Sequence, residues 1–264
     1  MNIKPILRYQ LSGHFQVFRV LYGIIYAIFA AVIISKYVWP ASTENVNIST
    51  SDLTTMITIF IVGLTFFKDP FRFYISSGVS RKRFFAGMIS ALGITSAATA
   101  LLDCVNALIF SQFLNYHSLY QMLLNPEKIG TLISVKTAKG IETGEVFYKI
   151  AFTPSMLLKN FLWCVLAYFV CAMIGLFITV LYYRMSKVQK VIVSVSVPSF
   201  FLFVLPILDE YVARGSIGAV ISKGFEWWVN CGVNPAADII TRLLLAAVLA
   251  GITYYMVRKA EVKA

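Results

Sequence analysis

Charged residues are scarce in this chain of 264 residues, because Asp, Glu, Lys and Arg together make up only 13% of it. A soluble domain carries about a quarter of such residues. The shortage is uneven: long stretches have no charge, and the charges gather in short blocks between them. This pattern is typical of a chain solvated by lipid and argues against a soluble fold.

Acidic residues are scarcer than basic ones, 12 against 23, which gives a formal net charge of +11. An excess of this size is also found in nucleic-acid-binding proteins. Here the basic residues lie in blocks that flank apolar stretches, where Lys and Arg set membrane topology. We therefore expect membrane lipid, and no nucleic acid, as a partner.

The chain has little that could do chemistry. His14 and His117 are far apart in the expected topology, and none of the four cysteines forms a Cys-x-x-Cys pair. It also lacks the Gly-x-x-x-x-Gly-Lys-[Ser/Thr] loop, the His-Glu-x-x-His motif and the Gly-x-Ser-x-Gly motif. We expect no catalytic residue, no metal site, no cofactor in this chain and no ATPase site of its own. An intramembrane enzyme is thereby disfavoured.

Apolar residues are abundant, at 59% of the chain. A helix needs about 20 of them to cross the hydrocarbon core. The sequence predicts an all-α integral membrane protein with a single transmembrane domain, residues 1–264, and six transmembrane helices. The expected spans are Val20–Trp39, Leu53–Phe67, Phe84–Phe113, Phe161–Tyr183, Val191–Leu208 and Ile239–Val257.

The first segment, Asn2–Arg19, has a helical pattern with two faces. The apolar face holds Ile3, Leu7, Leu11, Phe15 and Phe18, and the polar face holds Lys4, Arg8, Ser12 and Gln16. This pattern predicts an amphipathic helix lying in the membrane interface.

The charges of the loops predict the orientation. Lys and Arg dominate the segments before the first span, after the second, after the fourth and at the C-terminus, with only Asp69 and Glu261 opposing them. The short loop on the other side has Glu44 and Asp52 and no positive charge. The positive-inside rule places both termini in the cytoplasm of a multi-pass protein of the cell membrane.

Two outer loops are long enough to hold structure. In Leu114–Asn160, the stretches Thr131–Thr137 and Glu145–Thr153 alternate weakly and are separated by turn signals, which predicts a small extracellular β-hairpin. In Asp209–Asp238, the stretch Val212–Ile221 is too short to span and is expected to be a re-entrant or interfacial helix.

Asp103 is the one acidic residue deep within an apolar run. Such a residue can be a proton or cation site. The alternative, which we favour, is that Asp103 lies near the outer end of its helix and faces water or a loop donor. On the same helix, Gly87, Ala91, Thr95 and Ala98 form a face of small residues that suits close helix packing.

The fifth run contains two prolines, which can kink a helix. Pro198, Phe200 and Phe203, with Phe60 and Phe66 of the second run, are the candidate residues of a substrate cavity. Ordinary lipid-facing aromatic surface is the alternative interpretation.

The segment between the second and third spans predicts a short helix across the cytoplasmic surface, about Phe71–Ser77. Pro70 favours its start, Gly78 its stop, and Ser80 the N-cap of the third span. Held at both ends by spans, this helix could transmit movement from a cytoplasmic partner. A solvated loop with topogenic charge is the simpler alternative.

The stretch Ile75–Met88, with Ser-Gly-Val-Ser-Arg-Lys-Arg-Phe-Phe at its centre, resembles the cytoplasmic loop of ABC-2 type ABC transporter permeases. The order of expected elements is similar along nearly the whole chain. Among small permeases of this type, exporters of antimicrobial or cytolytic peptides, such as the phenol-soluble modulin exporter, are similar.

This resemblance implies a membrane-spanning subunit of an ATP-driven exporter for an amphipathic peptide or lipid-like substrate. It implies a second permease copy or paralogue and a cytoplasmic ABC ATPase that binds the ATP and Mg²⁺. It also implies a coupling helix that contacts this ATPase, for which the candidate residues are Phe71, Phe73, Gly78, Ser80, Arg81, Lys82 and Arg83. A stand-alone secondary transporter or channel is the alternative function.

Overall fold

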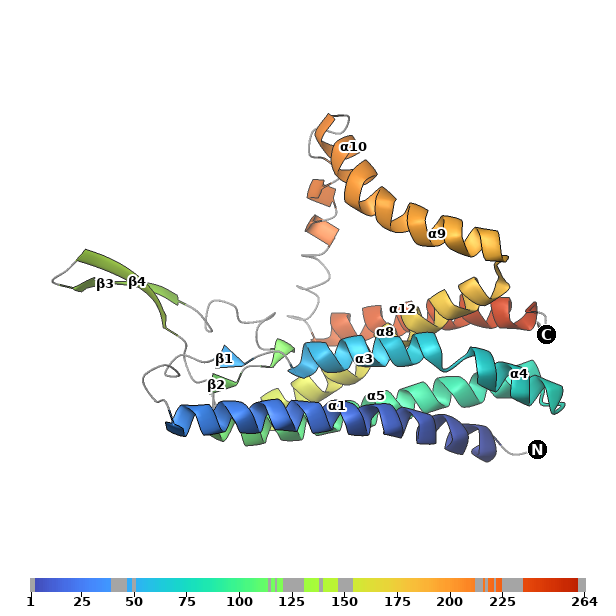
Figure 1. Cartoon of the computed structure of the whole chain (residues 1–264), viewed down its shortest axis with the longest axis horizontal. Helices are drawn as coiled ribbons and strands as arrows, with labels where there is room; N and C mark the ends of the chain where they lie inside the picture. The colour runs from blue at the N-terminus through green and yellow to red at the C-terminus, as the bar shows by residue number, and fades with distance from the viewer. Residues whose placement is uncertain are drawn as a thin grey trace.

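The computed structural model shows an elongated bundle of helices (Figure 1). It describes residues 3–38, 47–48, 51–113, 115–116, 118–120, 131–137, 140–146, 154–211, 216, 218–220, 222–224 and 235–260. Within these residues, five helices are long and apolar enough to cross a membrane. The length and composition of these helices indicate that the chain is a helical membrane protein.

Helix α1 runs without a break over Lys4–Val38. The sequence predicted a separate interfacial helix over Asn2–Arg19, and the structure differs. No proline interrupts the helix after Pro5, and buried Gln10 and His14 attach its first half to other helices. Gln10 Nε2 donates to the carbonyl of Phe66 at 3.4 Å. The N-terminal segment thus lies along the bundle instead of across its end.

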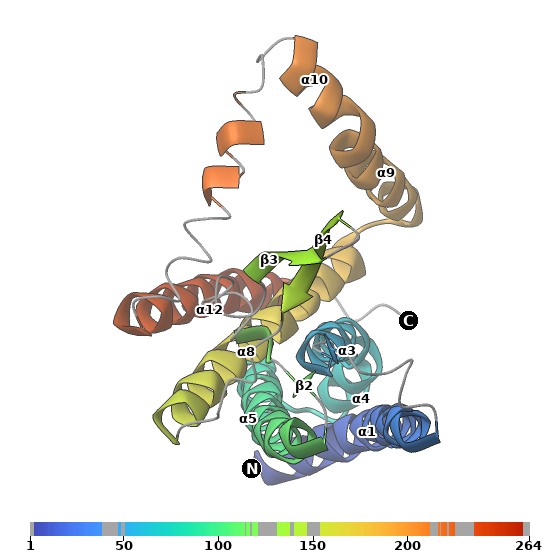
Figure 2. The same cartoon turned by 90° about the vertical axis from the view of Figure 1, so that its left-hand side faces the viewer.

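Helices α3 (Ser51–Thr65), α5 (Arg81–Phe113), α8 (Pro154–Arg184) and α12 (Pro235–Arg258) complete the bundle. Helix α8 contacts α3, α5 and α12, and α1 lies against α5 (Figure 2). Four expected spans overlap these helices. Helix α8 begins at Pro154, before the start of the expected span Phe161–Tyr183.

Glycine lets α3 and α8 approach closely. A Cβ added to Gly63 would lie 2.3 Å from the carbonyl oxygen of Ala172, and one added to Gly175 would lie 2.4 Å from that of Phe60. Real Cβ atoms do not come this close, so only glycine fits at both positions. Small residues at a crossing are the usual means of bringing two membrane helices into contact.

The expected span Val191–Leu208 is built from three pieces. They are α9 (Lys187–Ser199), a π-helical segment η1 (Phe200–Val204) and α10 (Leu205–Tyr211). Pro206 cannot donate a backbone hydrogen bond, and a π turn directly before it is one way for a helix to accommodate that loss. This arm, residues 187–211, projects away from the bundle, and neither α9 nor α10 has a buried residue (Figures 1 and 2).

Two small strand pairs lie at the end of the bundle opposite the termini (Figure 1). Strand β1 (Asn47–Ile48) pairs in parallel with β2 (Asn115–Tyr116), and β3 (Thr131–Thr137) pairs antiparallel with β4 (Gly140–Val146). The second strand was expected over Glu145–Thr153 but begins at Gly140, opposite Thr137. Residues 147–153, and most of the expected re-entrant stretch Val212–Ile221, lie outside the described residues.

The start of α1 and the end of α12 lie at the same end of the bundle (Figure 1). Tyr74 donates to the carbonyl of Pro5 at 3.3 Å, and Arg81 donates to the carbonyl of Arg258. The basic residues of the segments around them share this end: Lys68, Arg83, Arg184, Lys187 and Lys259. We call it the basic end.

Candidate functional site

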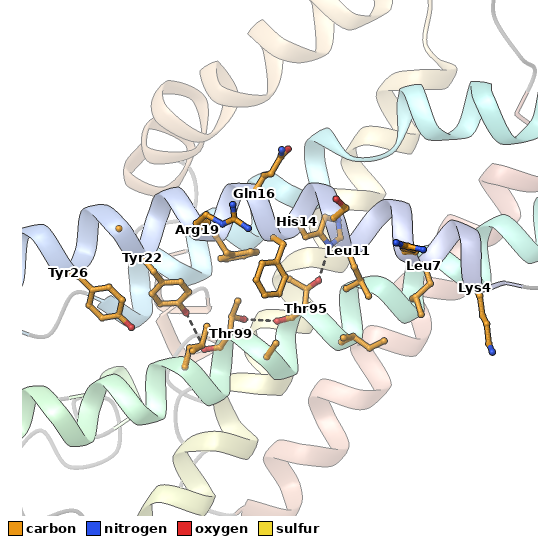
Figure 3. A pocket seen from close by; sticks show the side chains of 18 residues that line it. Lys4, Leu7, Leu11, His14, Gln16, Arg19, Tyr22, Tyr26, Thr95 and Thr99 are labelled. Atoms are coloured by element: carbon orange, nitrogen blue, oxygen red, sulfur yellow. Dashed lines mark hydrogen bonds between the residues drawn. The ribbon is translucent and has the colours of Figure 1, made fainter.

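A groove of about 1030 Å³ lies between α1 and α5 in the described part of the chain (Figure 3). It runs along most of the first half of α1. Its lining residues are Lys4, Leu7, Arg8, Leu11, Ser12, His14, Phe15, Gln16, Phe18, Arg19, Tyr22, Gly23, Tyr26, Ile94, Thr95, Ala98, Thr99 and Leu102.

The floor of the groove is held together by contacts from α1 to the small-residue face of α5. A Cβ added to Gly87 would lie 2.9 Å from Ile6 Cγ2, so this glycine admits α1 closely. Thr95 is buried against His14, whereas Ala98 is exposed and lines the groove. The small-residue face thus packs as expected at Gly87 and Thr95 but is open at Ala98.

His14 on α1 is held against α5 by a hydrogen bond. Its Nδ1 lies 2.8 Å from Thr95 Oγ1, and Thr95 Oγ1 also lies 2.8 Å from the carbonyl oxygen of Ala91. The other ring nitrogen, Nε2, is buried and has no hydrogen-bond partner among the described residues.

The rim of the groove carries a polar stripe of α1, formed by Arg8, Ser12, Gln16 and Arg19. These residues recur at helical spacing, so they lie on one face. All four are exposed. Within the described residues, neither Arg8 nor Arg19 forms an ion pair. Beside the stripe lie apolar side chains, of which Phe15 is 67% exposed and Ile94 46% exposed. The groove therefore offers positive charge and apolar surface together.

At its far end the groove meets a buried carboxylate, that of Asp103 on α5. Tyr22 on α1 donates to Asp103 Oδ1 at 3.0 Å, Tyr168 on α8 donates to Oδ2 at 2.6 Å, and Thr55 on α3 donates to Oδ1 at 3.4 Å. Asp103 is 1% exposed. Four helices therefore converge on a single carboxylate. The favoured expectation that Asp103 faces water or a loop donor is wrong, because helix hydroxyls surround it.

Asp52, at the start of α3, lies close to this carboxylate. Its backbone carbonyl accepts from Tyr168 at 3.4 Å, and its Oδ2 accepts from the backbone N–H of Leu119 at 2.8 Å. Tyr168 thus links the two aspartates. Sequence reasoning missed the hydroxyl donors, since Tyr22, Thr55 and Tyr168 stand in apolar runs with no local motif. The polar residues at matching depths in several spans were the available signal.

Arg242 on α12 contacts Trp163 on α8. Arg242 Nε donates to Asp238 Oδ1 at 2.6 Å, and its guanidinium lies 4.6 Å from the centre of the Trp163 ring. Arg242 is buried, with only 4% of its surface exposed. Burial and the carboxylate of Asp238 raise the pKa of Tyr120, whose ring packs on Trp163.

The expected short helix between the second and third spans is α4 (Lys68–Ser76). Gly78 has a positive φ of 79°, Gly78 N donates to the carbonyl of Ile75 at 3.1 Å, and Val79 N donates to that of Tyr74 at 3.0 Å. This is the Schellman motif, in which glycine ends a helix. Pro70 is the third residue of α4 rather than the first.

The candidate coupling residues are divided between the core and the surface. Phe71 is fully buried and packs with Phe67, Phe84 and Tyr183, at ring separations of 5.1, 5.5 and 5.6 Å respectively. It therefore cannot touch another protein directly. Phe73 is 61% exposed. Gly78, Ser80, Lys82 and Arg83 are exposed too, while Arg81 is half-buried and bound to the end of α12.

The candidate substrate-cavity residues are not brought together. Phe60 is half-buried in the α3–α8 contact, and Phe66 packs edge-on against His14 at 4.9 Å. Pro198, Phe200 and Phe203 are exposed on the projecting arm. Because α9 leaves the bundle, these residues do not form a cavity within one copy of the described chain.

Within the part of the chain that the structure describes, no group of three His, Cys, Asp or Glu side chains could hold a metal ion. Cys104, Cys164 and Cys171 are free thiols in the bundle, and Cys231 lies outside the described residues. No family model, characterised protein or solved structure matches this chain.

Proposed function

We propose that this chain is the membrane-spanning permease subunit of an ATP-driven ABC exporter. The observation that carries the proposal is the position of α4. It is a short helix at the basic end, and one side of it presents Phe73 to solvent. On its buried side, Phe71 packs with the rings of Phe67, Phe84 and Tyr183, which we call the aromatic cluster. This is the arrangement expected of a helix that passes force from a cytoplasmic partner to a bundle.

The aromatic cluster explains how such force would spread. Phe67 follows α3, Phe84 belongs to α5 and Tyr183 to α8, and Phe71 of α4 touches all three rings. Tyr74 joins α4 to the first turn of α1 as well. Closely packed side chains transmit displacement because interiors are not compressible. A push on α4 therefore acts on four helices at once.

The remaining parts of the proposal follow from the charges. The basic end lies in the cytoplasm, the protein spans the cell membrane, and the arm at residues 187–211 forms the sixth span. ATP and Mg²⁺ belong to a separate ATPase. A second permease copy or paralogue completes the proposed complex, and the exposed side chains of the arm are available for contact with it. The substrate is an amphipathic peptide or lipid-like molecule.

A stand-alone secondary transporter is the second candidate, and Asp103 favours it. Buried acidic residues in spans often form proton or cation sites. Here, however, the carboxylate is occupied by three hydroxyl donors from neighbouring helices. That arrangement is equally suited to holding the helices together.

Replacing Phe73 by Asp tests the proposal. Val188→Asp is the matched control, because Val188 is 69% exposed at the same end but belongs to α9. The protein is purified from its native membrane and associated ATPase activity is measured. We expect Phe73→Asp to weaken recovery of the ATPase about tenfold or more, as for an interface hot spot, with Val188→Asp unchanged.

Two results would contradict the proposal. One is the absence of any ATPase in the preparation from the unaltered chain. The other is normal recovery of the ATPase with Phe73→Asp in a correctly inserted protein, which would remove α4 as the contact and leave the stand-alone transporter as the better account.

A further inference from the structure

Arg19 occupies a position that is costly for a cation in lipid. It is exposed on α1, and Tyr22, one turn farther on, shares the Asp103 carboxylate with Tyr168 of α8. Helix α8 rises about 24 Å from Tyr168 to the basic end at Arg184. Arg19 therefore lies well inside the apolar part of the bundle. Charged side chains at such depth face a polar cavity or an opposite charge.

The surroundings of Arg19 define the chemistry that would satisfy it. Within the described residues no carboxylate pairs with it. Ser12 and Gln16 add hydrogen-bonding groups along the same stripe, and α5 contributes Ile94 and Leu102 to the lining of the groove. The matching ligand has one anionic group with several acceptor oxygens and one long apolar tail.

We propose that the α1–α5 groove binds one anionic phospholipid, with its phosphate at Arg19 and an acyl chain on Ile94 and Leu102. The planar guanidinium donates two parallel hydrogen bonds to phosphate oxygens. Helical side chains lean toward the helix N-terminus, so Arg19 reaches back along the groove toward the basic end. Lys4 and Arg8 extend the positive potential to that end, where anionic headgroups are attracted. The site does not depend on an ATPase partner.

Thermal unfolding of the full chain in neutral detergent tests the site. The probes are dioctanoyl-phosphatidylglycerol, which is anionic, and dioctanoyl-phosphatidylcholine, which is zwitterionic. We expect only the anionic lipid to raise the unfolding temperature of the unaltered protein. Arg19→Gln should weaken its apparent affinity about tenfold or more. Arg83→Gln, an exposed cation outside the groove, should leave that affinity unchanged.

A second variant tests the groove without altering charge. Gly23 lines the groove, and a Cβ added there meets nothing within 4 Å. Gly23→Leu should therefore fold and fill the groove, which removes the response to the anionic lipid. Equal responses in Arg19→Gln and the unaltered protein would overturn the proposal, and so would an equal loss in Arg83→Gln. Native mass spectrometry showing a lipid-free dimer that Gly23→Leu dissociates would assign the groove to a second copy instead.

Discussion

The phenol of Tyr168 on α8 donates a 2.6 Å hydrogen bond to the carboxylate of Asp103 on α5. Both side chains are buried, at 0% and 1% exposure. The bond thus joins the most central helix of the bundle to the helix that forms the floor of the groove.

Removing this hydroxyl should destabilise the bundle. Tyr168→Phe leaves the buried Asp103 Oδ2 without its short donor, and a buried acceptor left unsatisfied costs about 1–3 kcal/mol. Tyr26→Phe is the control, because Tyr26 donates to the neutral Asn106 Oδ1 at 2.9 Å and is partly exposed. We expect the unfolding temperature in detergent to fall more for Tyr168→Phe. Equal decreases would mean that Asp103 is not a centre of stability.

A methyl group at the α3–α8 contact should separate the two helices. Gly63→Ala places a Cβ against the carbonyl of Ala172, and overpacking of this kind costs about 1–3 kcal/mol. Gly93→Ala on α5 is the control, since its nearest neighbour would be Phe169 Cε2 at 3.8 Å. We expect lower thermal stability for Gly63→Ala and unchanged or higher stability for Gly93→Ala. A tolerated Gly63→Ala would show that the helices cross farther apart.

The orientation can be measured with single cysteines in a variant lacking Cys104, Cys164, Cys171 and Cys231. A membrane-impermeant maleimide added to intact cells should label Thr137→Cys in β3. Lys82→Cys, exposed at the basic end, should be labelled only after permeabilisation. This follows because the positive-inside rule places the basic end in the cytoplasm. The reverse pattern would invert the orientation and remove α4 from contact with ATP-hydrolysing partners.

The sequence predicted the elements whose signals are local. The stop of α4 at Gly78 was readable because glycine adopts the positive φ that ends a helix. The apolar runs likewise revealed the helices of the bundle, since hydropathy over about 20 residues needs no knowledge of neighbours. The small-residue face that includes Gly87 was also predicted, because its residues recur at helical spacing along the sequence.

Features that depend on tertiary contacts were not predicted. The amphipathic pattern of Asn2–Arg19 suits either a membrane surface or a helix face, and only the partners of Gln10 and His14 decide between them. Phe71 and Phe73 are both phenylalanines and lie two residues apart. Phe71 is buried and Phe73 is exposed, because only one face of α4 packs on the aromatic cluster. Likewise, nothing near Asp103 in sequence indicates the tyrosines of α1 and α8.

The glycine contact between α3 and α8 determines where the molecule can move. With backbone against backbone at Gly63 and Gly175, these two helices cannot slide past each other without collision, so they act as a fixed frame. The α9–α10 arm follows α8 through Met185 and Ser186, and Ser186 is the capped start of α9. A hydrogen bond of 3.1 Å between the hydroxyls of Tyr182 on α8 and Ser194 on α9 also links the arm to the frame. Hinges of this kind are a few residues at the end of an element. Rotation at this joint would move the arm relative to the frame and would have to break the Tyr182–Ser194 hydrogen bond.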